Sequence, residues 1–563
     1  MHASEGGRVM DRVERTSISS TRRVRRVWYV GILALLVGLV ALPATGVGRK
    51  AKPTADGLLA HVSQSVQFHY FLKHPDAAPA RLRETLTAFD QLTAVRSTGA
   101  RAPSAPITSD VFNLDDVGFP QNEESVAVSG RNVVSGTNDY RGLLDPEVNF
   151  TGWHLSTNGG ATVANEGLLP SVDLSGDQTP SGGDPVYAFF GGSFYAGSLA
   201  YDADDPFGES GPQANGITIY KSDVATLSSC PGGSDPACWQ GAAAAQTVAQ
   251  DGGSFYDKEW IAVGDTGDGT HVWVVFSDFN LDFSAPLGYE AAQIRAVRCD
   301  GDLANCTAPI LISGSDPDVQ FGDVTIGPDG RTYITWAEIQ GELEFEAQTF
   351  VIKMVIAEPG STTFGPTRVV ATEGNAIPFG GFLHANDFRV ATYPKNDVFP
   401  RGEDPRIYVT WDRCRERVLD TVCEEPEIKL AYSDDDGTTW KTKTISSGGD
   451  NYFPTLDVDP ATGQLAVAWF TNRTDVFHHR YAVELVTVNA NTAKVTNRQL
   501  IGALNEPDAD PLLGGFFIGD YIEVQAVRGI AYVAYNANFA TLRLLGEGVP
   551  IFQQDNYLTK TAL

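Results

Sequence analysis

Basic residues, methionine and cysteine are scarce in this chain. Its 563 residues include 41 Lys or Arg against 70 Asp or Glu, with 3 Met and 6 Cys. A net charge of −29 repels nucleic acids and anionic membrane surfaces, so neither is an expected partner. The simplest role of this charge is solubility outside the cell.

Metal-binding patterns are also missing from the sequence. No two cysteines have Cys-x-x-Cys spacing, and no histidine lies within several residues of a cysteine. Ca²⁺ is the cation that such an acidic chain would attract, but no loop has the ligand spacing of an EF-hand. We therefore expect no metal site and no cofactor.

Long helical periodicity is absent after about residue 95, which excludes a mainly helical fold. Charged residues make up only 20% of the chain, whereas Gly and Pro number 57 and 31. Short Val, Ile, Tyr and Trp runs separated by such turn residues are typical of an all-β protein.

One long apolar run stands near the N-terminus, from Val27 to Ala44, directly after four arginines at positions 22, 23, 25 and 26. This order predicts an export signal, and the run is also long enough to act as an uncleaved membrane anchor. We expect three regions: a signal or anchor at 1–52, a partly helical spacer or propeptide at 53–109, and the main domain at 110–563. The protein is then secreted or part of the cell envelope, and is tethered to a membrane only if residues 27–44 are retained.

The six cysteines fall into three close pairs. An even number of cysteines in an exported chain favours disulfides over free thiols. The expected pairs are Cys230 with Cys238, Cys299 with Cys306, and Cys414 with Cys423.

A tight polar turn joins an apolar strand to a tryptophan at Ser433–Trp440. Ser433 and Asp435 carry oxygens that can accept hydrogen bonds from turn amides, and Gly437 can adopt the positive φ that the turn needs. Trp440 returns a large ring to an apolar interface. A second, more divergent copy contains Ser156, Asn158 and Gly160, with Val163 in place of the tryptophan.

The Ser-x-Asp-x-Gly-x-Thr-Trp spacing resembles the Asp-box of the bacterial-neuraminidase (BNR) repeat, which occurs in sialidases and other secreted bacterial β-propellers. The resemblance is close at the two turns and extends as a repeat pattern over roughly residues 110–540. It implies a sialidase-like β-propeller in which the Asp-box fastens a turn between the two outer strands of a blade. We expect the first two cysteine pairs to occupy the same turn in the second and third repeats.

One pattern recurs seven times from Val111 onward: an apolar strand, a short turn, a second strand and a polar loop. Four-stranded sheets of this kind bury their faces by stacking in a ring, so we predict a single β-propeller. Seven blades are favoured, and six, as in sialidases, is the alternative. We expect the last blade to be closed by residues 550–553 pairing with the segment after Ala105. The first strands of the repeats begin at Ser125, Pro185, Trp260, Val324, Phe388, Leu456 and Tyr521.

The residues just before each first strand, and those in the loop after each second strand, are expected to surround one end of the central channel, which we call the mouth. Aspartates at such places also cap and fix turns. The acidic candidates for ligand binding are Glu124, Asp184, Asp257, Asp323, Asp387, Asp412 and Asp520.

The resemblance to sialidases implies three arginines that clamp a substrate carboxylate, a tyrosine–glutamate nucleophile pair and an acidic acid/base residue. The residues that can supply the clamp and the pair are Arg141, Arg413, Arg473, Tyr521 and Glu259. The Arg-Ile-Pro signature of sialidases is absent, since Arg406-Ile-Tyr lacks the proline.

The sequence therefore predicts an exported, monomeric propeller that binds a glycan or a surface protein at an acidic mouth. An exo-sialidase-type glycoside hydrolase and a structural envelope protein are the alternatives. Fold alone does not decide among these three.

Overall fold

The computed structural model describes residues 56–80, 82–83, 86, 111–113, 119–145, 147–341, 348–378, 381–402, 404–418, 422–538, 541–542 and 551–563. Thr54–Leu563 form one compact unit. The predicted export segment, including the apolar run 27–44, lies outside the described residues. In the part of the chain that the structure describes, no helix is both long and apolar enough to cross a membrane.

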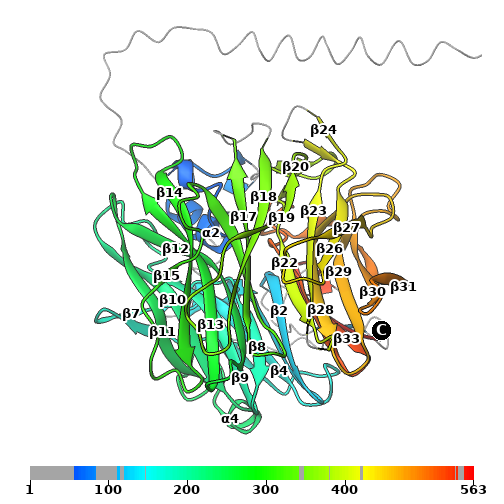
Figure 1. Cartoon of the computed structure of the whole chain (residues 1–563). Coiled ribbons are helices and arrows are strands. Elements are labelled where there is room, and N and C mark those ends of the chain that lie inside the picture. Colours follow the sequence, from blue (N-terminus) through cyan, green and yellow to red (C-terminus); the bar gives the residue numbers. More distant parts are fainter. Residues whose placement is uncertain are drawn as a thin grey trace, which may run out of the picture. The chain divides into compact units, whose positions relative to one another are not determined.

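Seven antiparallel sheets of four strands follow one another along the chain (Figure 1). The first three consist of β2–β5 (Gln121–Ser129, Asn132–Asp139, Thr151–Ser156, Asn165–Leu168), β8–β11 (Val186–Phe190, Ser193–Tyr201, Gln213–Ser222, Gln240–Ala249) and β12–β15 (Ser254–Asp265, Thr270–Leu281, Tyr289–Asp300, Ile310–Leu311). The next three consist of β16–β19 (Val319–Ile326, Thr332–Gln340, Thr349–Ala357, Arg368–Glu373), β22, β23, β26 and β27 (Lys395–Phe399, Arg406–Arg413, Glu427–Ser433, Lys441–Thr444) and β28–β31 (Asn451–Asp459, Gln464–Thr471, Tyr481–Asn489, Lys494–Asn505).

The seventh sheet joins the two ends of the ring. It contains β32 (Glu523–Val527), β33 (Ile530–Ala537), β36 (Asp555–Ala562) and β1 (Val111–Asn113), in that order. The prediction that the segment after Ala105 pairs near the C-terminus is confirmed, but the partner is β36 and not residues 550–553. Within that predicted stretch, β35 (Ile551–Phe552) pairs instead with β34 (Thr541–Leu542).

The first strand of each sheet, here called the inner strand, lies next to the inner strands of the sheets before and after it. The neighbouring pairs are β2 and β8, β8 and β12, β12 and β16, β16 and β22, β22 and β28, β28 and β32, and β32 and β2. This closed succession of sheets is the architecture of a β-propeller, in which every sheet buries its faces against two others.

Carboxylates on the inner strands bind these strands to one another. Each accepts a hydrogen bond from a backbone N–H of the next inner strand, so the polar side chains of the channel wall also hold the ring together. The four pairs are Asp323 with Asn396 N (2.6 Å), Asp397 with Val458 N (2.6 Å), Asp457 with Ala526 N (2.5 Å) and Glu523 with Val126 N (2.8 Å).

One predicted inner strand was placed wrongly. We expected the fifth repeat to begin at Phe388, but the inner strand of that sheet is Lys395–Phe399. Residues Arg389–Val390 form β21 of a smaller sheet with β20 (Gly381–Leu383), β24 (Glu416–Val418) and β25 (Val422–Glu424). The true strand reads as polar because Lys395 and Asp397 face the channel, whereas Phe388 is buried in an apolar cluster.

Apolar side chains between neighbouring sheets form the core. The large rings come mainly from the second and third strands, whose faces meet the next sheet. The fully buried tryptophans are Trp153, Trp239, Trp273, Trp336, Trp411 and Trp469. The elements outside the ring sheets are η1 (Asp56–Leu58), α2 (Gln64–Lys73), η2 (Tyr140–Leu144), the hairpin β6–β7 (Val172–Leu174, Asp177–Thr179), α4 (Val224–Ser229) and η3 (Pro507–Ala509).

The turn Ser433–Trp440 connects the third and fourth strands of its sheet and has the hydrogen bonds expected from its sequence. Ser433 Oγ accepts from Gly437 N (2.9 Å), and Asp435 Oδ1 accepts from Thr439 N (2.8 Å). Trp440 Nε1 donates to the Gly437 carbonyl (3.0 Å), and Gly437 has a φ of 74°.

The Ser156 turn lies at the same place in the first sheet and repeats these bonds. Ser156 Oγ accepts from Gly160 N (2.9 Å), and Asn158 Oδ1 accepts from Thr162 N (3.0 Å). Asparagine replaces aspartate here without loss of the backbone bond, because either side chain offers the required oxygen.

All three predicted disulfides are present. Cys230–Cys238 and Cys299–Cys306 lie between the third and fourth strands of the second and third sheets, where the first and fifth sheets have the two turns described above. Cys414–Cys423 lies between β23 and β26 and joins the small sheet to the ring.

Candidate functional site

The mouth is the end of the channel at which the inner strands begin, and its backbone is unusual. Residues at these starts have positive φ, which is rare for non-glycine residues and directs a side chain away from the regular strand face. Several inner strands also show a register shift at this point, as a β-bulge does. The φ angles are 61° at Glu123, 55° at Asp184, 53° at Lys258, 61° at Phe321, 53° at Phe453 and 86° at Gly519.

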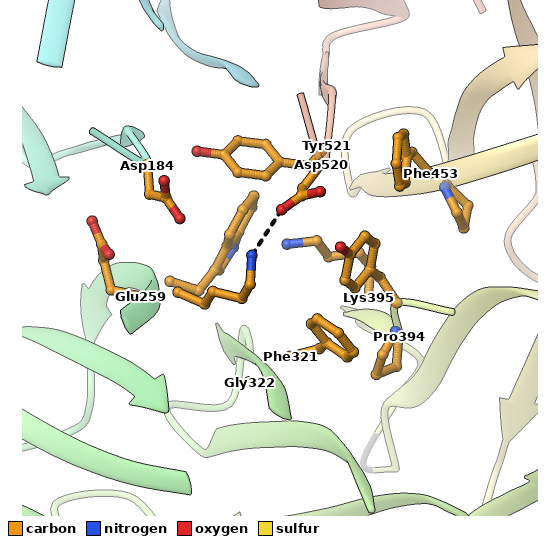
Figure 2. Close-up of a pocket in the computed structure, with 13 residues that line it drawn as sticks. Asp184, Glu259, Phe321, Gly322, Pro394, Lys395, Phe453, Asp520 and Tyr521 are labelled. Carbon is orange, nitrogen blue, oxygen red and sulfur yellow. Dashed lines mark hydrogen bonds and ion pairs between the residues drawn. The ribbon is translucent and has the colours of Figure 1, made fainter. Parts of the chain in front are cut away.

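These starts line a cavity of about 50 Å³ on the channel axis. Figure 2 shows Asp184 and Glu259 on one side of it and Phe321 and Phe453 on the other. The lining therefore combines ionisable and aromatic side chains. The ionisable residues are Asp184, Lys258, Glu259, Lys395 and Asp520, and the aromatic residues are Trp260, Phe321, Tyr393, Phe453 and Tyr521.

Asp520 is the centre of an ion cluster. Arg389 binds it through two nitrogens, Nε to Oδ1 at 3.0 Å and Nη2 to Oδ2 at 2.5 Å. Lys258 Nζ lies 2.8 Å from the same carboxylate. Burial alone would raise the pKa of Asp520, but the charges of Arg389 and Lys258 outweigh burial and hold that pKa well below its usual value.

The pKa values of the other carboxyl groups of the mouth are raised. Burial raises the pKa of Asp257 to about 7 and raises those of Glu123, Asp184 and Glu259 as well. The neighbouring Asp184 charge adds to the shift at Glu123 and Glu259. The mouth thus places carboxyl groups whose pKa is raised close to Asp520, whose pKa is lowered.

Helix α2, from the segment before the ring, lies over the mouth. Ser63 N donates to Asp257 Oδ2 (2.7 Å) and Ser65 Oγ donates to Asp184 Oδ1 (3.1 Å). The sequence predicted residues 53–109 to be a spacer or propeptide. The described part of that segment contains the expected helix and is packed against the ring.

Two of the predicted catalytic residues, Tyr521 and Glu259, line the same cavity. Tyr521 Oη donates to the Pro185 carbonyl (3.0 Å), and its ring stands edge-on to Trp260 at 5.5 Å between centroids. Both Glu259 carboxyl oxygens are buried without a hydrogen-bond partner among the described residues.

The three predicted clamp arginines lie elsewhere, and none is among the described residues that line the cavity. Each is paired with carboxylates near the loop that carries it. Arg141 pairs with Asp139 (2.6 Å) and Glu166 (3.5 Å), Arg413 with Glu373 (3.3 Å) and Glu427 (3.6 Å), and Arg473 with Glu484 (2.9 Å).

The predicted ligand-binding acids are divided among several environments. Asp184 and Asp520 line the cavity, and Asp257 lies under α2. Asp412 accepts from Tyr393 N (3.3 Å) and Phe453 N (3.1 Å), so it positions two aromatic residues of the cavity. Of the rest, Asp323 holds β22, Glu124 is buried and Asp387 is exposed.

Sequence reasoning missed the aromatic residues and the cations of the site. Phe453-Pro lies at the register shift of its inner strand, as Lys258-Glu does, and Tyr393-Pro directly precedes its inner strand, so aligning the repeats would have identified them. Arg389 was assigned to an inner strand, and Lys258 was read only as part of an acidic group. Their roles depend on a pairing with Asp520 across 131 and 262 residues of sequence.

One group of described residues brings three metal-ligand atoms together: His479, Glu506 and Asp508. His479 Nε2 lies 2.5 Å from Glu506 and 3.6 Å from Asp508. Burial lowers the pKa of His479, but the Ala385 carbonyl and these carboxylates raise it overall. The arrangement is that of an imidazolium in an ion pair.

Comparison with known proteins gives no relative by sequence: no family profile matches, and no curated protein matches. Solved structures give distant matches. The Hadza microbial sialidase Hz136 is 11% identical, with 73% of each chain covered and a TM-score of 0.39. A protein of unknown function from Dyadobacter fermentans is 11% identical, with 80% of this chain and 99% of that chain covered and a TM-score of 0.40. The α-L-arabinofuranosidase Arb93A of Fusarium graminearum is 12% identical, with 70% and 99% covered and a TM-score of 0.41.

Proposed function

We propose that this protein is an exported, seven-bladed β-propeller that binds a carbohydrate at its mouth. The observation that carries the proposal is the combination of aromatic and ionisable side chains in the lining of one cavity. A sugar ring presents an apolar C–H face and a polar rim of hydroxyl groups. Aromatic walls suit the first, and a few placed polar groups suit the second.

Extracellular location is supported by the three disulfides, which persist in oxidising compartments. The basic residues and apolar run at the N-terminus support export. Carbohydrate at the cell surface is therefore the partner to which the mouth would be exposed.

Binding is tested by titrating the full chain with sialylated and neutral oligosaccharides in a calorimeter. Phe453→Leu keeps an apolar side chain but removes the ring, so affinity should fall about two- to tenfold, since an aromatic contact contributes roughly 0.5–1.5 kcal/mol. Phe477→Leu is the matched control, because Phe477 is 82% exposed on another loop. Equal affinity in both variants would contradict a carbohydrate site at the mouth.

Glycoside hydrolysis of the exo-sialidase type is the second candidate, and the observation that favours it is the presence of Tyr521 and Glu259 in one cavity. A retaining hydrolase needs a nucleophile and a proton donor on either side of the scissile bond. The basic residues at the mouth are Lys258, Arg389 and Lys395 in place of the three arginines that the sequence suggested.

Hydrolysis is tested with sialyl and neutral aryl glycosides. If Tyr521 and Glu259 react, Tyr521→Phe and Glu259→Gln should each lower kcat at least a hundredfold, because acid–base catalysis typically contributes about 10²–10⁴-fold. Arg473→Gln, outside the cavity, should leave kcat unchanged. Turnover that is retained in both Tyr521→Phe and Glu259→Gln would remove this candidate and leave binding intact.

A further inference from the structure

The described residues of the segment 56–86 occupy the mouth with specific contacts. Several of their groups bond to ring residues at the site. Among these bonds are Ser63 N to Asp257 (2.7 Å), Ser65 Oγ to Asp184 (3.1 Å), Gln64 Nε2 to Asp520 (3.3 Å), Gln64 Oε1 from Gly519 N (3.1 Å), the Ala60 carbonyl from Arg389 (3.2 Å) and His69 Nδ1 with Tyr201 Oη (2.7 Å).

The charge of the mouth suits the end of the helix that enters it. Helix α2 begins at Gln64, with Ser63 as its N-cap, so its N-terminal turn faces Asp184, Asp257 and Asp520. The N-terminus of a helix carries a partial positive charge and unpaired N–H groups, and it binds anionic groups for that reason. The carboxylates that would meet a ligand thus already have a partner of the opposite polarity.

Apolar contacts also hold the segment on the ring, in addition to the polar contacts. Leu58, Val62 and Val66 are fully buried, and Phe68 packs edge-on against Tyr140 at 4.7 Å between ring centroids. The segment belongs to the same apolar cluster as the inner parts of the second and third sheets. Such burial keeps it in place until something displaces it.

The space left beneath the segment is too small for a sugar. The cavity measures about 50 Å³, whereas pockets that hold small-molecule ligands measure roughly 300–1,000 Å³. A carbohydrate that enters from the mouth reaches Phe321 or Phe453 only if the segment leaves.

The ring itself does not depend on the segment for closure. The strand β1 that pairs with β36 begins at Val111, after the segment in the chain, and none of the described residues 56–86 forms a strand. The segment is therefore an addition to a closed ring, in the position of a bound ligand.

We propose that residues 56–86 are an intramolecular plug, which occupies the carbohydrate site of the mouth and must be displaced before a ligand binds. The inference concerns the regulation of that site and rests on the proposed function. In this proposal, the described part of the predicted propeptide keeps the exported ring inactive.

Gly57→Ala loosens the plug without altering the cavity. A Cβ at Gly57 would lie 2.4 Å from the Pro286 carbonyl oxygen and 2.8 Å from the Leu287 carbonyl carbon, so the segment has to move away from the third sheet. Gly211→Ala is the matched control, because a Cβ there meets no atom within 4 Å. Ser65→Ala, which removes the bonds of this hydroxyl to Asp184 and to Ser63 Oγ, is the milder second variant if Gly57→Ala fails to fold.

Two readouts on the full chain test the proposal. Hydroxyl-radical footprinting should show oxidation of Tyr393 and Phe453 rising at least threefold in Gly57→Ala and remaining unchanged in Gly211→Ala. Amide hydrogen exchange of residues 64–73 should accelerate at least tenfold in the same variant, whereas β2 and β12 keep their protection. Affinity for the oligosaccharide that binds best should rise at least tenfold.

The outcomes separate the two proposals. Faster exchange of α2 without greater oxidation of Tyr393 and Phe453 would overturn the plug, because the mouth would stay covered by something else. Greater oxidation together with unchanged or weaker carbohydrate affinity would also overturn it. Greater oxidation with no carbohydrate bound by any variant would keep the plug as the cover of the mouth and reject carbohydrate as its ligand.

Discussion

Asp412 and Asp520 both stand near the mouth, and the sequence presents them alike. Asp520, in the lining of the cavity, forms ion pairs with Arg389 and Lys258. Asp412 instead accepts hydrogen bonds from two backbone N–H groups. The first carboxyl group stays ionised because cations surround it, and burial raises the pKa of the second to about 7. The neighbours of each aspartate thus determine its part in the site: Asp412 positions the backbone, and Asp520 presents a charged group to the cavity.

Replacement of Asp412 should show how much its two hydrogen bonds to backbone N–H groups stabilise the fold. Asp412→Ala leaves two buried N–H donors without an acceptor, and we expect unfolding free energy to fall by about 2–4 kcal/mol, since one orphaned donor costs roughly 1–3 kcal/mol. Asp412→Asn keeps one acceptor oxygen of the same shape and should lose less than half of that. Urea unfolding of both variants measures the difference. Equal losses would mean that Asp412 acts through its charge and not through these hydrogen bonds.

The elements of the fold could be predicted to different degrees. The second strands were found because Trp336, Trp411 and Trp469 end apolar runs that lie buried between sheets. The inner strand at Lys395 was missed, since channel-facing strands carry polar side chains that bond to the next sheet and so lose the apolar pattern on which strand prediction relies. The disulfide register was predictable, because short loops between paired strands leave each cysteine one near partner.

The site was predictable only in part for a related reason. Asp184 and Asp520 directly precede predicted inner strands, so the spacing of the repeats was enough to predict that they lie at the mouth. The cover over them comes from Ser63 and Ser65, which lie in a segment without repeats and reach the ring across more than a hundred residues of sequence. Local pattern contains no signal for such a contact.

At the scale of the whole molecule, buried acids make stability depend on pH. Several carboxyl groups have pKa values raised by burial, so the folded chain holds protons that the unfolded chain releases above about pH 4. Their stabilising effect is complete below that pH and is lost as the pH rises through the folded values. The values are about 6 for Asp318, Asp397 and Asp510, and about 7 for Asp257, Asp412 and Glu523.

Buried histidines act in the opposite direction. Burial lowers the pKa of His61, His69 and His154 to about 3, so their contribution is present above about pH 6.5 and is lost as the pH falls toward 3. The six acids outnumber the three histidines, and protonation also relieves a net charge of −29. The acids should therefore dominate between pH 8 and 5, and the histidines together with Asp520 should dominate below pH 4.

We accordingly expect the full chain to be most stable at mildly acidic pH. The free energy of unfolding should be larger at pH 5 than at pH 8 by several kcal/mol, since one pKa unit corresponds to about 1.4 kcal/mol, and should fall again at pH 3. Urea unfolding at the three pH values measures this profile. The double variant Asp257→Asn with Asp412→Asn removes two of the groups and should flatten the rise between pH 8 and 5, whereas Asp387→Asn, at an exposed site, should leave it unchanged. A wild-type chain that is more stable at pH 8 than at pH 5 would show that the buried carboxyl groups of the ring stay ionised.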